Sequence, residues 1–297
     1  MNPRTRATIG ALIAVTVWGA SFVATKLALR DVSPATVVWL RFSMGAAILW
    51  LAVAWRRQFS LPEKSSLAFF ALLGFLGITF HQWLQSTGLQ TAQATTTAWI
   101  VATTPVFMAL IGWLALRERL VWLQIGGILL ATIGVLLVVT NGDLAALAGG
   151  RFGTVGDILI LISSLNWAVF SALSRRGLQR ARAASPTLMM AYVMSFGWLF
   201  NTVLFLLGPG PGEISQLSRD GWLGVLFLGI FCSGLAYIFW YDALQLLPVA
   251  QTGAYLYIEP FVTLLVAAAI LSEPITLASL LGGATILVGV WLVQRRP

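Results

Sequence analysis

The chain has 297 residues, of which 59% are hydrophobic and only 9% are charged, against about 25% charged residues in an average soluble domain. This composition, with a mean hydropathy of +0.88, excludes a soluble globular protein. The formal net charge of +8 comes from short basic tracts between apolar segments, which indicates membrane orientation rather than nucleic-acid binding. The single cysteine, Cys232, excludes an internal disulfide and a cysteine-based metal cluster.

Apolar segments run along the whole chain, and they have the length of membrane-spanning helices, about 20 residues. In chain order they predict ten spans, over residues 7–28, 34–55, 66–88, 93–116, 120–140, 154–174, 187–207, 221–243, 249–271 and 275–293. Roughly a hundred residues are then left for loops and tails, so no sizeable aqueous domain fits. The expected fold class is an all-α polytopic membrane protein with ten transmembrane helices.

Arg4 and Arg6 precede the first span, as basic residues precede the apolar part of a signal peptide. This span is longer than the about 7–15 apolar residues of a typical signal peptide, so we expect it to be retained. With the N-terminus inside, 13 of the 18 lysines and arginines lie in inner segments, four lie in outer segments, and Arg41 lies within a span. This bias predicts that both termini are cytoplasmic, in a protein of the bacterial cytoplasmic (inner) membrane.

The second half of the chain repeats the first. An offset of 155 residues pairs Gly74 with Gly229, Pro105 with Pro260, Glu118 with Glu273, Gly127 with Gly282 and Gly134 with Gly289. Near the two starts the offset is 149, which pairs Trp18 with Trp167 and Lys26 with Arg175. The sequence therefore predicts a first repeat over residues 1–141, a linker over 142–153 and a second repeat over 154–297.

Each repeat holds five spans, and because five is odd, the second repeat must cross the membrane in the opposite direction to the first. The charges support this inversion. Glu118 lies between two arginines on the predicted inner side, whereas its counterpart Glu273 lies between Ser272 and Pro274 on the outer side. Both glutamates lie near span ends, where we expect them to contact helix termini or loops.

These features resemble the drug/metabolite transporter superfamily, and within it the ten-helix proteins built from two EamA-type repeats. The resemblance rests on Trp18 with Lys26, on Trp167 with Arg175, and on a proline followed 13 residues later by a glutamate in each repeat. Among the members, the chain is most similar to the YddG-type exporters of aromatic and other amino acids. The resemblance implies alternating access to a cavity lined mainly by spans one, three, four, six, eight and nine, with spans five and ten peripheral.

Polar side chains within spans are costly in lipid and are candidates for function. Span three carries His81, Gln82 and Gln85, and span eight carries Tyr237 and Trp240. The offset of 155 pairs Gln82 with Tyr237 and Gln85 with Trp240. Spacings of three and four place each set on one helical face, so we expect two related stripes that face each other across a central cavity.

Aromatic residues add to these stripes. Trp18 and Trp167 are related by the repeat, and Trp99 lies one span beyond the stripe that contains His81. Large rings with an N–H or O–H suit a substrate with an apolar body and few polar groups, and a ring can hold an ammonium group. We therefore predict an amino acid or a similar amphiphile as substrate, with packing or an interfacial aromatic belt as the alternative role of these rings.

Four further residues are candidates for coupling or gating. His81 is the one histidine of the chain, and it either titrates near neutral pH or stays neutral and hydrogen-bonded. Glu259 lies within span nine, where an ionised carboxylate is costly, and is either a proton site or, as we slightly favour, a structural lock. Pro105 and Pro260 are expected to kink spans four and nine.

The leading hypothesis is a secondary transporter that exports small amphiphilic metabolites, in the first place aromatic or other apolar amino acids, by rocking of one repeat against the other. No catalytic residue, cofactor or metal site is predicted, and the sequence lacks the G-x-x-x-x-G-K-[ST] motif of ATP-binding proteins. The expected partners are the substrate and membrane lipid. The glycines of spans five and ten are expected to serve close helix packing, with contact to a second copy of the chain as the other option.

Three alternatives stay open. The substrate could be another metabolite or a drug-like amphiphile. A channel would show a ring of like charges or a filter loop, and the sequence shows neither. An intramembrane enzyme would need a nucleophile and a base, for which His81 could form a Ser–His pair, although the sequence has no H-E-x-x-H motif.

Overall fold

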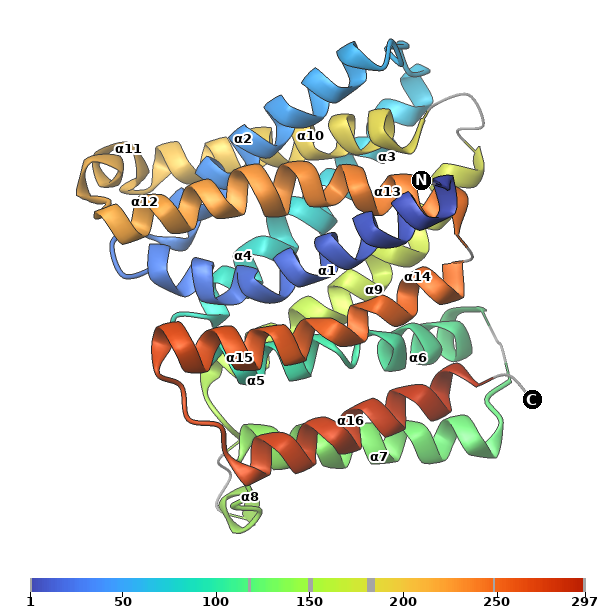
Figure 1. Ribbon diagram of the computed structural model, residues 1–297, viewed down its shortest axis with the longest axis vertical. Coiled ribbons are helices and arrows are strands. Elements are labelled where there is room, and N and C mark those ends of the chain that lie inside the picture. Colours follow the sequence, from blue (N-terminus) through green and yellow to red (C-terminus); the bar gives the residue numbers. More distant parts are fainter. Residues whose placement is uncertain (1, 117–118, 149–151, 181–184, 248, 296–297) are drawn as a thin grey trace.

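The computed structural model describes residues 2–116, 119–148, 152–180, 185–247 and 249–295. Within these ranges every regular element is a helix (Figure 1). Ten segments are long and apolar enough to cross a membrane, which confirms the number of spans expected from the sequence. The protein is therefore an all-helical integral membrane protein.

Six spans are single helices: α1 (Pro3–Ala28), α2 (Pro34–Trp55), α7 (Trp122–Val139), α9 (Val155–Arg180), α10 (Pro186–Leu207) and α16 (Leu277–Gln294). Span three consists of α3 (Lys64–Gly74), η1 (Phe75–Phe80) and α4 (His81–Gly88), and span four of α5 (Ala94–Val101) and α6 (Thr104–Leu116). Span eight consists of α12 (Arg219–Leu226), η3 (Phe227–Leu235) and α13 (Ala236–Leu246), and span nine of α14 (Val249–Tyr255), η4 (Leu256–Ile258) and α15 (Glu259–Leu271). The four interrupted spans are thus two repeat-related pairs, three with eight and four with nine.

The short helices α8 (Ala145–Ala148), α11 (Gly210–Glu213) and η2 (Ile214–Gln216) lie in connections. α8 and α11 lie at one end of the bundle, and both chain termini lie at the opposite end (Figure 1). Five spans begin at the end with α8 and α11, and side-chain oxygens serve each start: Glu213 at α2, Glu273 at α5, Asp157 and Thr154 at α9, Asp31 and Ser218 at α12, and Thr276 at α16. These oxygens accept hydrogen bonds from N–H groups that have no partner within a helix, and the carboxylates also suit the positive end of the helix dipole.

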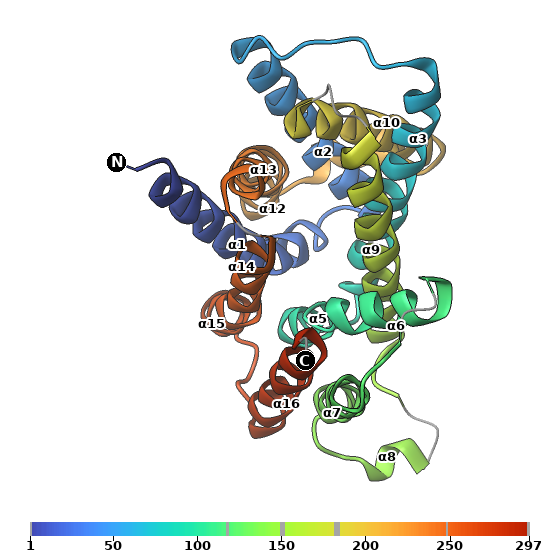
Figure 2. The same ribbon diagram turned by 90° about the vertical axis from the view of Figure 1, so that its right-hand side faces the viewer.

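Helices from the two halves of the chain interleave. α1 packs against α13 and α15, α2 packs against α10 and η3, and α4 packs against α9. Figure 2 shows this arrangement from the end that holds the termini, with helices of early and late colour side by side. The two repeats are therefore continuous in the sequence but not separate in space, because helices of one repeat pack against helices of the other.

α7 and α16, which are spans five and ten, form a closely packed pair at one edge of the molecule (Figures 1 and 2). A Cβ on Gly127 would lie 2.6 Å from the carbonyl oxygen of Gly289, and a Cβ on Gly134 would lie 2.7 Å from that of Gly282. Only glycine lets the two backbones approach so closely. These glycines serve packing within one chain, so they give no argument for the second copy that the sequence analysis considered.

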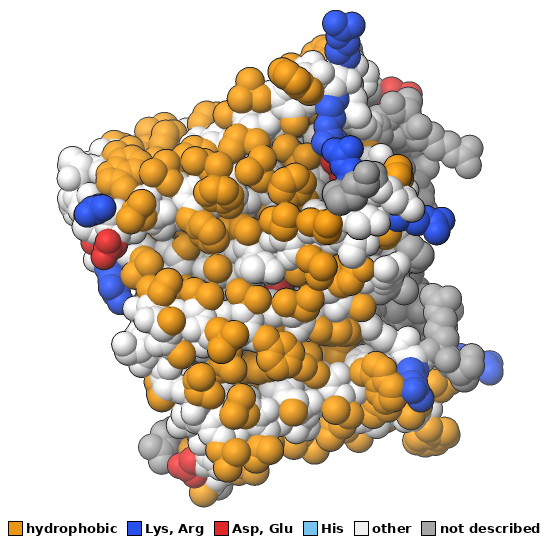
Figure 3. Space-filling view, viewed as in Figure 1, with side chains coloured by type: hydrophobic (Ala, Val, Ile, Leu, Met, Phe, Trp, Pro, Cys, Tyr) orange, Lys and Arg blue, Asp and Glu red, His pale blue; other side chains and the backbone are white. Residues whose placement is uncertain are grey.

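Hydrophobic side chains cover the face of the molecule in Figure 3, whereas charged side chains gather toward its two ends. Exposed large apolar residues come from many helices, for example Leu51 of α2, Leu129 of α7, Leu207 of α10 and Leu265 of α15. An apolar band between polar ends is the surface expected of a protein surrounded by lipid.

Candidate substrate site between the repeats

Spans three and eight, which carry the two predicted polar stripes, each contain a π-helical segment. η1 ends at Phe80 and η3 ends at Leu235, and the repeat offset of 155 relates these two residues. The residues of the two stripes come directly after these segments in the chain, beginning with His81 in α4 and with Tyr237 in α13. π-helical turns are rare and are frequent at functional sites. Neither segment can be predicted from the sequence, because no residue pattern separates this hydrogen bonding from that of an α-helix.

Trp18 of α1 meets span eight. The ring of Trp18 lies 5.6 Å from that of Tyr237, at an interplanar angle of 73°, and 5.2 Å from that of Trp240. The indole N–H of Trp18 donates to the carbonyl oxygen of Cys232 in η3 at 3.0 Å. Three of the predicted site residues thus form one aromatic cluster, built from both repeats.

His81 and Trp167 form a second cluster, where span three meets span six. Their rings lie 4.7 Å apart, and the Trp167 ring lies 4.8 Å from that of Phe170. Nδ1 of His81 lies 3.1 Å from the carbonyl oxygen of Ser163 in α9, which requires Nδ1 to carry the proton. Trp167 therefore contacts span three, just as its counterpart in the first repeat, Trp18, contacts span eight. Both tryptophans pack against the same hydrophobic core.

Arg41 of α2 connects spans three and eight. The guanidinium donates from Nε to the Ser233 hydroxyl at 3.0 Å and from Nη1 to Oε1 of Gln82 at 3.1 Å. It also lies close enough to Tyr237 to interact electrostatically. The residue is only 5% exposed. Arg41 is not among the site residues predicted from the sequence, although the cost of a charge in lipid is a signal that marks a cation within a span as a candidate.

Two other predicted site residues, Gln85 and Trp99, have no ring contact with either aromatic cluster in the described part of the chain. Gln85 is buried on α4, one turn beyond the stripe residues already described. Trp99 lies apart from both clusters: its N–H donates to the Ser279 hydroxyl of α16 at 3.0 Å, its ring meets that of Phe261 edge-on at 5.6 Å, and it packs on Gly283. The contacts of Trp99 hold α16 against α5, so we leave Trp99 out of the site.

Spans four and nine are interrupted just before Pro105 and Pro260. α5 ends at Val101 and α6 begins at Thr104, while the 3₁₀ turn η4 separates α14 from α15. Each proline is the second residue of the helix that follows the interruption, a place where its missing N–H costs no helical hydrogen bond. The kinks that the sequence predicts at both prolines are therefore seen as helix breaks at repeat-related positions.

Glu259 begins α15 within the membrane-spanning segment Gln251–Leu271. Its carbonyl oxygen accepts a hydrogen bond from the Thr263 hydroxyl, and that hydroxyl also lies 2.7 Å from the carbonyl oxygen of Gly19 in α1. α1 and α15 thus touch beside the first aromatic cluster. Among the described residues, no lysine or arginine lies within ion-pair distance of the Glu259 carboxyl. Its two predicted roles, proton site and structural lock, stay predictions.

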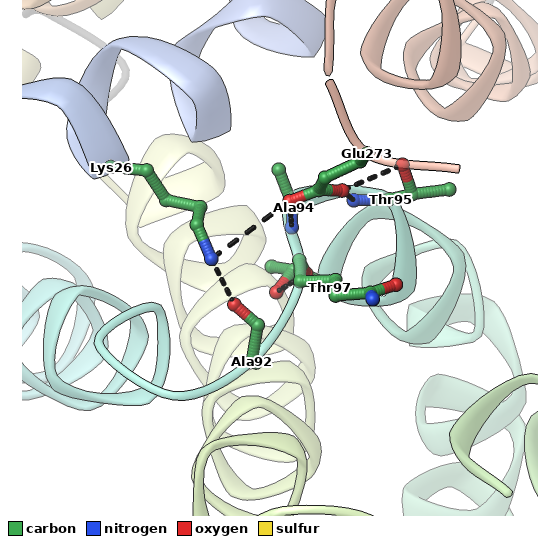
Figure 4. Close-up of polar contacts among 7 residues, drawn as sticks. Lys26, Ala92, Ala94, Thr95, Thr97 and Glu273 are labelled. Atoms are coloured by element: carbon green, nitrogen blue, oxygen red, sulfur yellow. Dashed lines mark hydrogen bonds and ion pairs between the residues drawn. The ribbon is translucent and has the colours of Figure 1, made fainter. Parts of the chain in front are cut away.

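Lys26 and Glu273 tie together α1, the start of α5 and the segment after α15 (Figure 4). Glu273 accepts hydrogen bonds from two backbone N–H groups at the start of α5, at 2.8 and 3.0 Å, and from the Thr95 hydroxyl at 3.0 Å. Nζ of Lys26 donates to the carbonyl oxygen of Ala92 at 2.6 Å and lies 3.8 Å from Glu273. The predicted contact of Glu273 with a helix terminus is confirmed, whereas Glu118 lies outside the described residues.

The described part of the chain includes the following two surface recesses. One of about 320 Å³ lies beside this tie and is lined by Lys26, Leu29, Arg30, Leu89, Gln90 and Leu271. The other, of about 420 Å³, lies between α2 and α10, with Trp50 and Ser195 in its walls. Neither recess is lined by the aromatic clusters. Trp18, Tyr237 and Trp167 of the two clusters pack in one hydrophobic core, and the cavity that the sequence predicts between the repeats stays a prediction.

Comparisons with known proteins agree with this two-repeat architecture. A solved crystal structure of a protein that is 21% identical in sequence aligns with a TM-score of 0.65, over 98% of this chain and 96% of that one. The fold is therefore shared with a structure determined by experiment.

Two curated relatives are transporters by name. An uncharacterized transporter of Archaeoglobus fulgidus is 26% identical and aligns over 100% of this chain and 99% of its own length. A probable terminal-alkyne amino-acid exporter of Streptantibioticus cattleyicolor is 27% identical over 96% of this chain and 92% of its own length. The pattern of the EamA-like transporter family matches twice, over residues 5–140 and 154–295. The chain therefore belongs to the EamA-like transporter family.

Proposed function

We propose that this protein exports small amphiphilic metabolites, in the first place aromatic or other apolar amino acids, by alternating access. The observation that carries this is the pair of repeat-related clusters, in which Trp18 and Trp167 each meet a span with a π-helical segment. Such a site offers rings for an apolar body and for an ammonium group. The relative named as a probable amino-acid exporter supports the same substrate class, and we assign the chain no enzymatic role.

The moving parts follow from the packing. Since helices of both halves interleave, one repeat cannot rock as a block against the other, and each moving layer has to combine helices of both. The helix breaks before Pro105 and Pro260 and the π-helical segments are the places where spans can bend, as in other transporters with discontinuous helices. The ion pair of Lys26 with Glu273 ties helices at one end of the bundle, and it has to open when substrate passes that end.

The direction and the driving force belong to the same proposal. The lysine and arginine bias supports a cytoplasmic location of both termini in the bacterial cytoplasmic membrane, and the structure has both termini at one end. Transport runs down the substrate gradient or is coupled to protons through His81 or Glu259. His81 belongs to the second cluster, and the backbone of Glu259 lies where α15 contacts α1 beside the first.

The test is uptake of a panel of radiolabelled amino acids into liposomes that contain the purified protein, with and without a pH gradient. Saturable uptake of aromatic or other apolar amino acids is expected. The variant Trp240→Ala should lower kcat/KM by roughly tenfold or more, because it removes a ring of the first cluster. Trp222→Ala, which removes an outward-facing ring of α12, is the matched control. If the wild type moves none of the panel, the amino-acid proposal fails and other amphiphilic metabolites take its place.

A further inference from the structure

No carboxylate in the described part of the chain forms an ion pair with Arg41, whose guanidinium lies 4.9 Å from the centre of the Phe42 ring. The two ion pairs found there join Lys26 to Glu273 and Arg56 to Asp242. Both lie near helix ends, whereas Arg41 lies within α2. Arg41 is instead held by neutral oxygens of Ser233 and Gln82. A charged side chain inside a membrane protein usually pairs with an opposite charge or marks a substrate path, and here the first explanation does not hold.

The guanidinium also has unused donors. Of its five N–H groups, the structure uses one on Nε and one on Nη1. Nη2 makes no hydrogen bond to any residue that the structure describes, so both of its N–H groups and the second one on Nη1 are left to donate. Adjacent N–H groups of this kind form the two parallel hydrogen bonds by which arginine binds a carboxylate.

The surroundings of Arg41 are the proposed site. Its partner Gln82 lies in span three and its partner Ser233 lies in span eight, the two repeat-related spans that contain a π-helical segment. Gln82 is itself a predicted site residue. Gln82 follows His81 of the second cluster in the sequence, and Ser233 follows Cys232, whose carbonyl oxygen accepts the hydrogen bond of Trp18 in the first cluster. Both partners are neutral, so they hold the guanidinium in place without neutralising its charge. They also belong to spans that move in the proposed transport cycle.

We infer that Arg41 binds the carboxylate of the transported substrate, an inference that rests on the proposed transport function. Arg41 then determines specificity for an acid group, while the rings of Trp18, Tyr237 and Trp240 take the apolar or ammonium part. A monoanion fits better than a phosphate, since one cation neutralises one carboxylate and a phosphate dianion would need a second. Lys26 is already bonded to the carbonyl oxygen of Ala92 and paired with Glu273.

The first experiment compares four ligands that share one ring and differ in their charges: phenylalanine, 3-phenylpropionate, phenylalaninamide and phenethylamine. Binding to the purified wild-type protein is measured by isothermal titration calorimetry. Both carboxylates should bind at least about tenfold more tightly than the amide and the amine. Equal affinity of phenylalanine and its amide would overturn the inference, whatever the transport assays show.

The second experiment uses variants and the same ligands. Arg41→Gln should bring the ratio of acid to amide affinity to about one, and Arg41→Lys, which keeps the charge and loses the paired donors, should give an intermediate ratio. Arg219→Gln, an exposed arginine at the start of α12, is the control with an unchanged ratio. A merely structural role of Arg41 would weaken acid and amide alike, so an unchanged ratio in Arg41→Gln contradicts the inference. If Arg41→Gln does not fold, the wild-type series and Arg41→Lys still decide.

The inference and the proposed function can fail separately. Binding of both carboxylates that depends on Arg41, without transport of any amino acid in the panel, would refute amino-acid export and keep the carboxylate site. Transport of phenethylamine as fast as phenylalanine would keep an amphiphile exporter and refute the carboxylate site. If neither carboxylate binds the wild type, the carboxylate site is also refuted.

Discussion

At the residue scale, Glu273 is a single carboxylate that serves three donors at the start of α5 and faces Lys26. Its side chain is only 8% exposed, so its hydrogen bonds are shielded from water. Glu273→Gln keeps the shape and removes the charge, and it should lower the free energy of unfolding by about 1.5–3 kcal/mol, measured by thermal unfolding in detergent. Asp220→Asn, at an exposed carboxylate, is the control, and equal melting temperatures of the two variants would refute this account.

Glu213 provides a pH-dependent contact at the same end of the bundle. Partial burial acts to raise its pKa, but hydrogen bonds from Thr36 and Ser33 outweigh this and hold the pKa below the usual value of 4.5. A pKa that is lower in the folded state gives stability that is present above pH 4.5 and is lost as the pH falls below it. Melting temperatures from pH 7 to 3 should therefore fall more steeply for the wild type than for Glu213→Gln. Parallel curves would show that the contact contributes nothing.

At the element scale, two neighbouring glycines of α7 differ in what surrounds them. A Cβ on Gly127 would meet the Gly289 carbonyl oxygen at 2.6 Å, whereas a Cβ on Gly126 would have nothing within 4 Å. Gly127→Ala should push α7 and α16 apart and lower the free energy of unfolding by about 1–3 kcal/mol. Gly126→Ala should leave it unchanged or raise it by up to about 1 kcal/mol through better helix propensity. Thermal unfolding of both variants checks this, and an equal loss in both would contradict the packing described.

Spans and breaks differ in how far the sequence predicts them. The ten spans follow from apolar length, and the breaks before Pro105 and Pro260 follow from the missing N–H of proline. The π-helical segments η1 and η3 could not be predicted, since their residues are ordinary apolar ones and the wider turns depend on packing between spans.

The candidate site was predicted in part for the same reason. Trp18, Tyr237 and Trp240 are each candidates from the sequence, and they come together because α1 packs against α13. Trp99 was assigned to the site by its place in the chain alone, and only the structure shows that its N–H bonds Ser279 of α16. Arg41 was counted as an exception in the charge bias, because a sequence does not show which side chains surround a buried cation.

At the scale of the whole molecule, the repeat offset predicts two related halves but not their interleaving. Contacts between residues more than a hundred positions apart, such as that of Trp18 with Cys232, decide which helices pair. Hydropathy carries no information on these pairings, since every span is apolar. The resulting molecule has its candidate site at the contact of both halves, which is where an alternating-access transporter of inverted repeats binds its substrate.

The most direct test of this account is a counterflow measurement. Liposomes that contain the protein are preloaded with unlabelled phenylalanine, diluted, and given a trace of radiolabelled phenylalanine outside. A carrier that alternates between two sides exchanges one molecule for the other, so we predict that the label accumulates transiently above its equilibrium level and that Trp240→Ala loses this overshoot. A channel lets each molecule cross independently, and label that only rises to equilibrium would contradict alternating access by this protein.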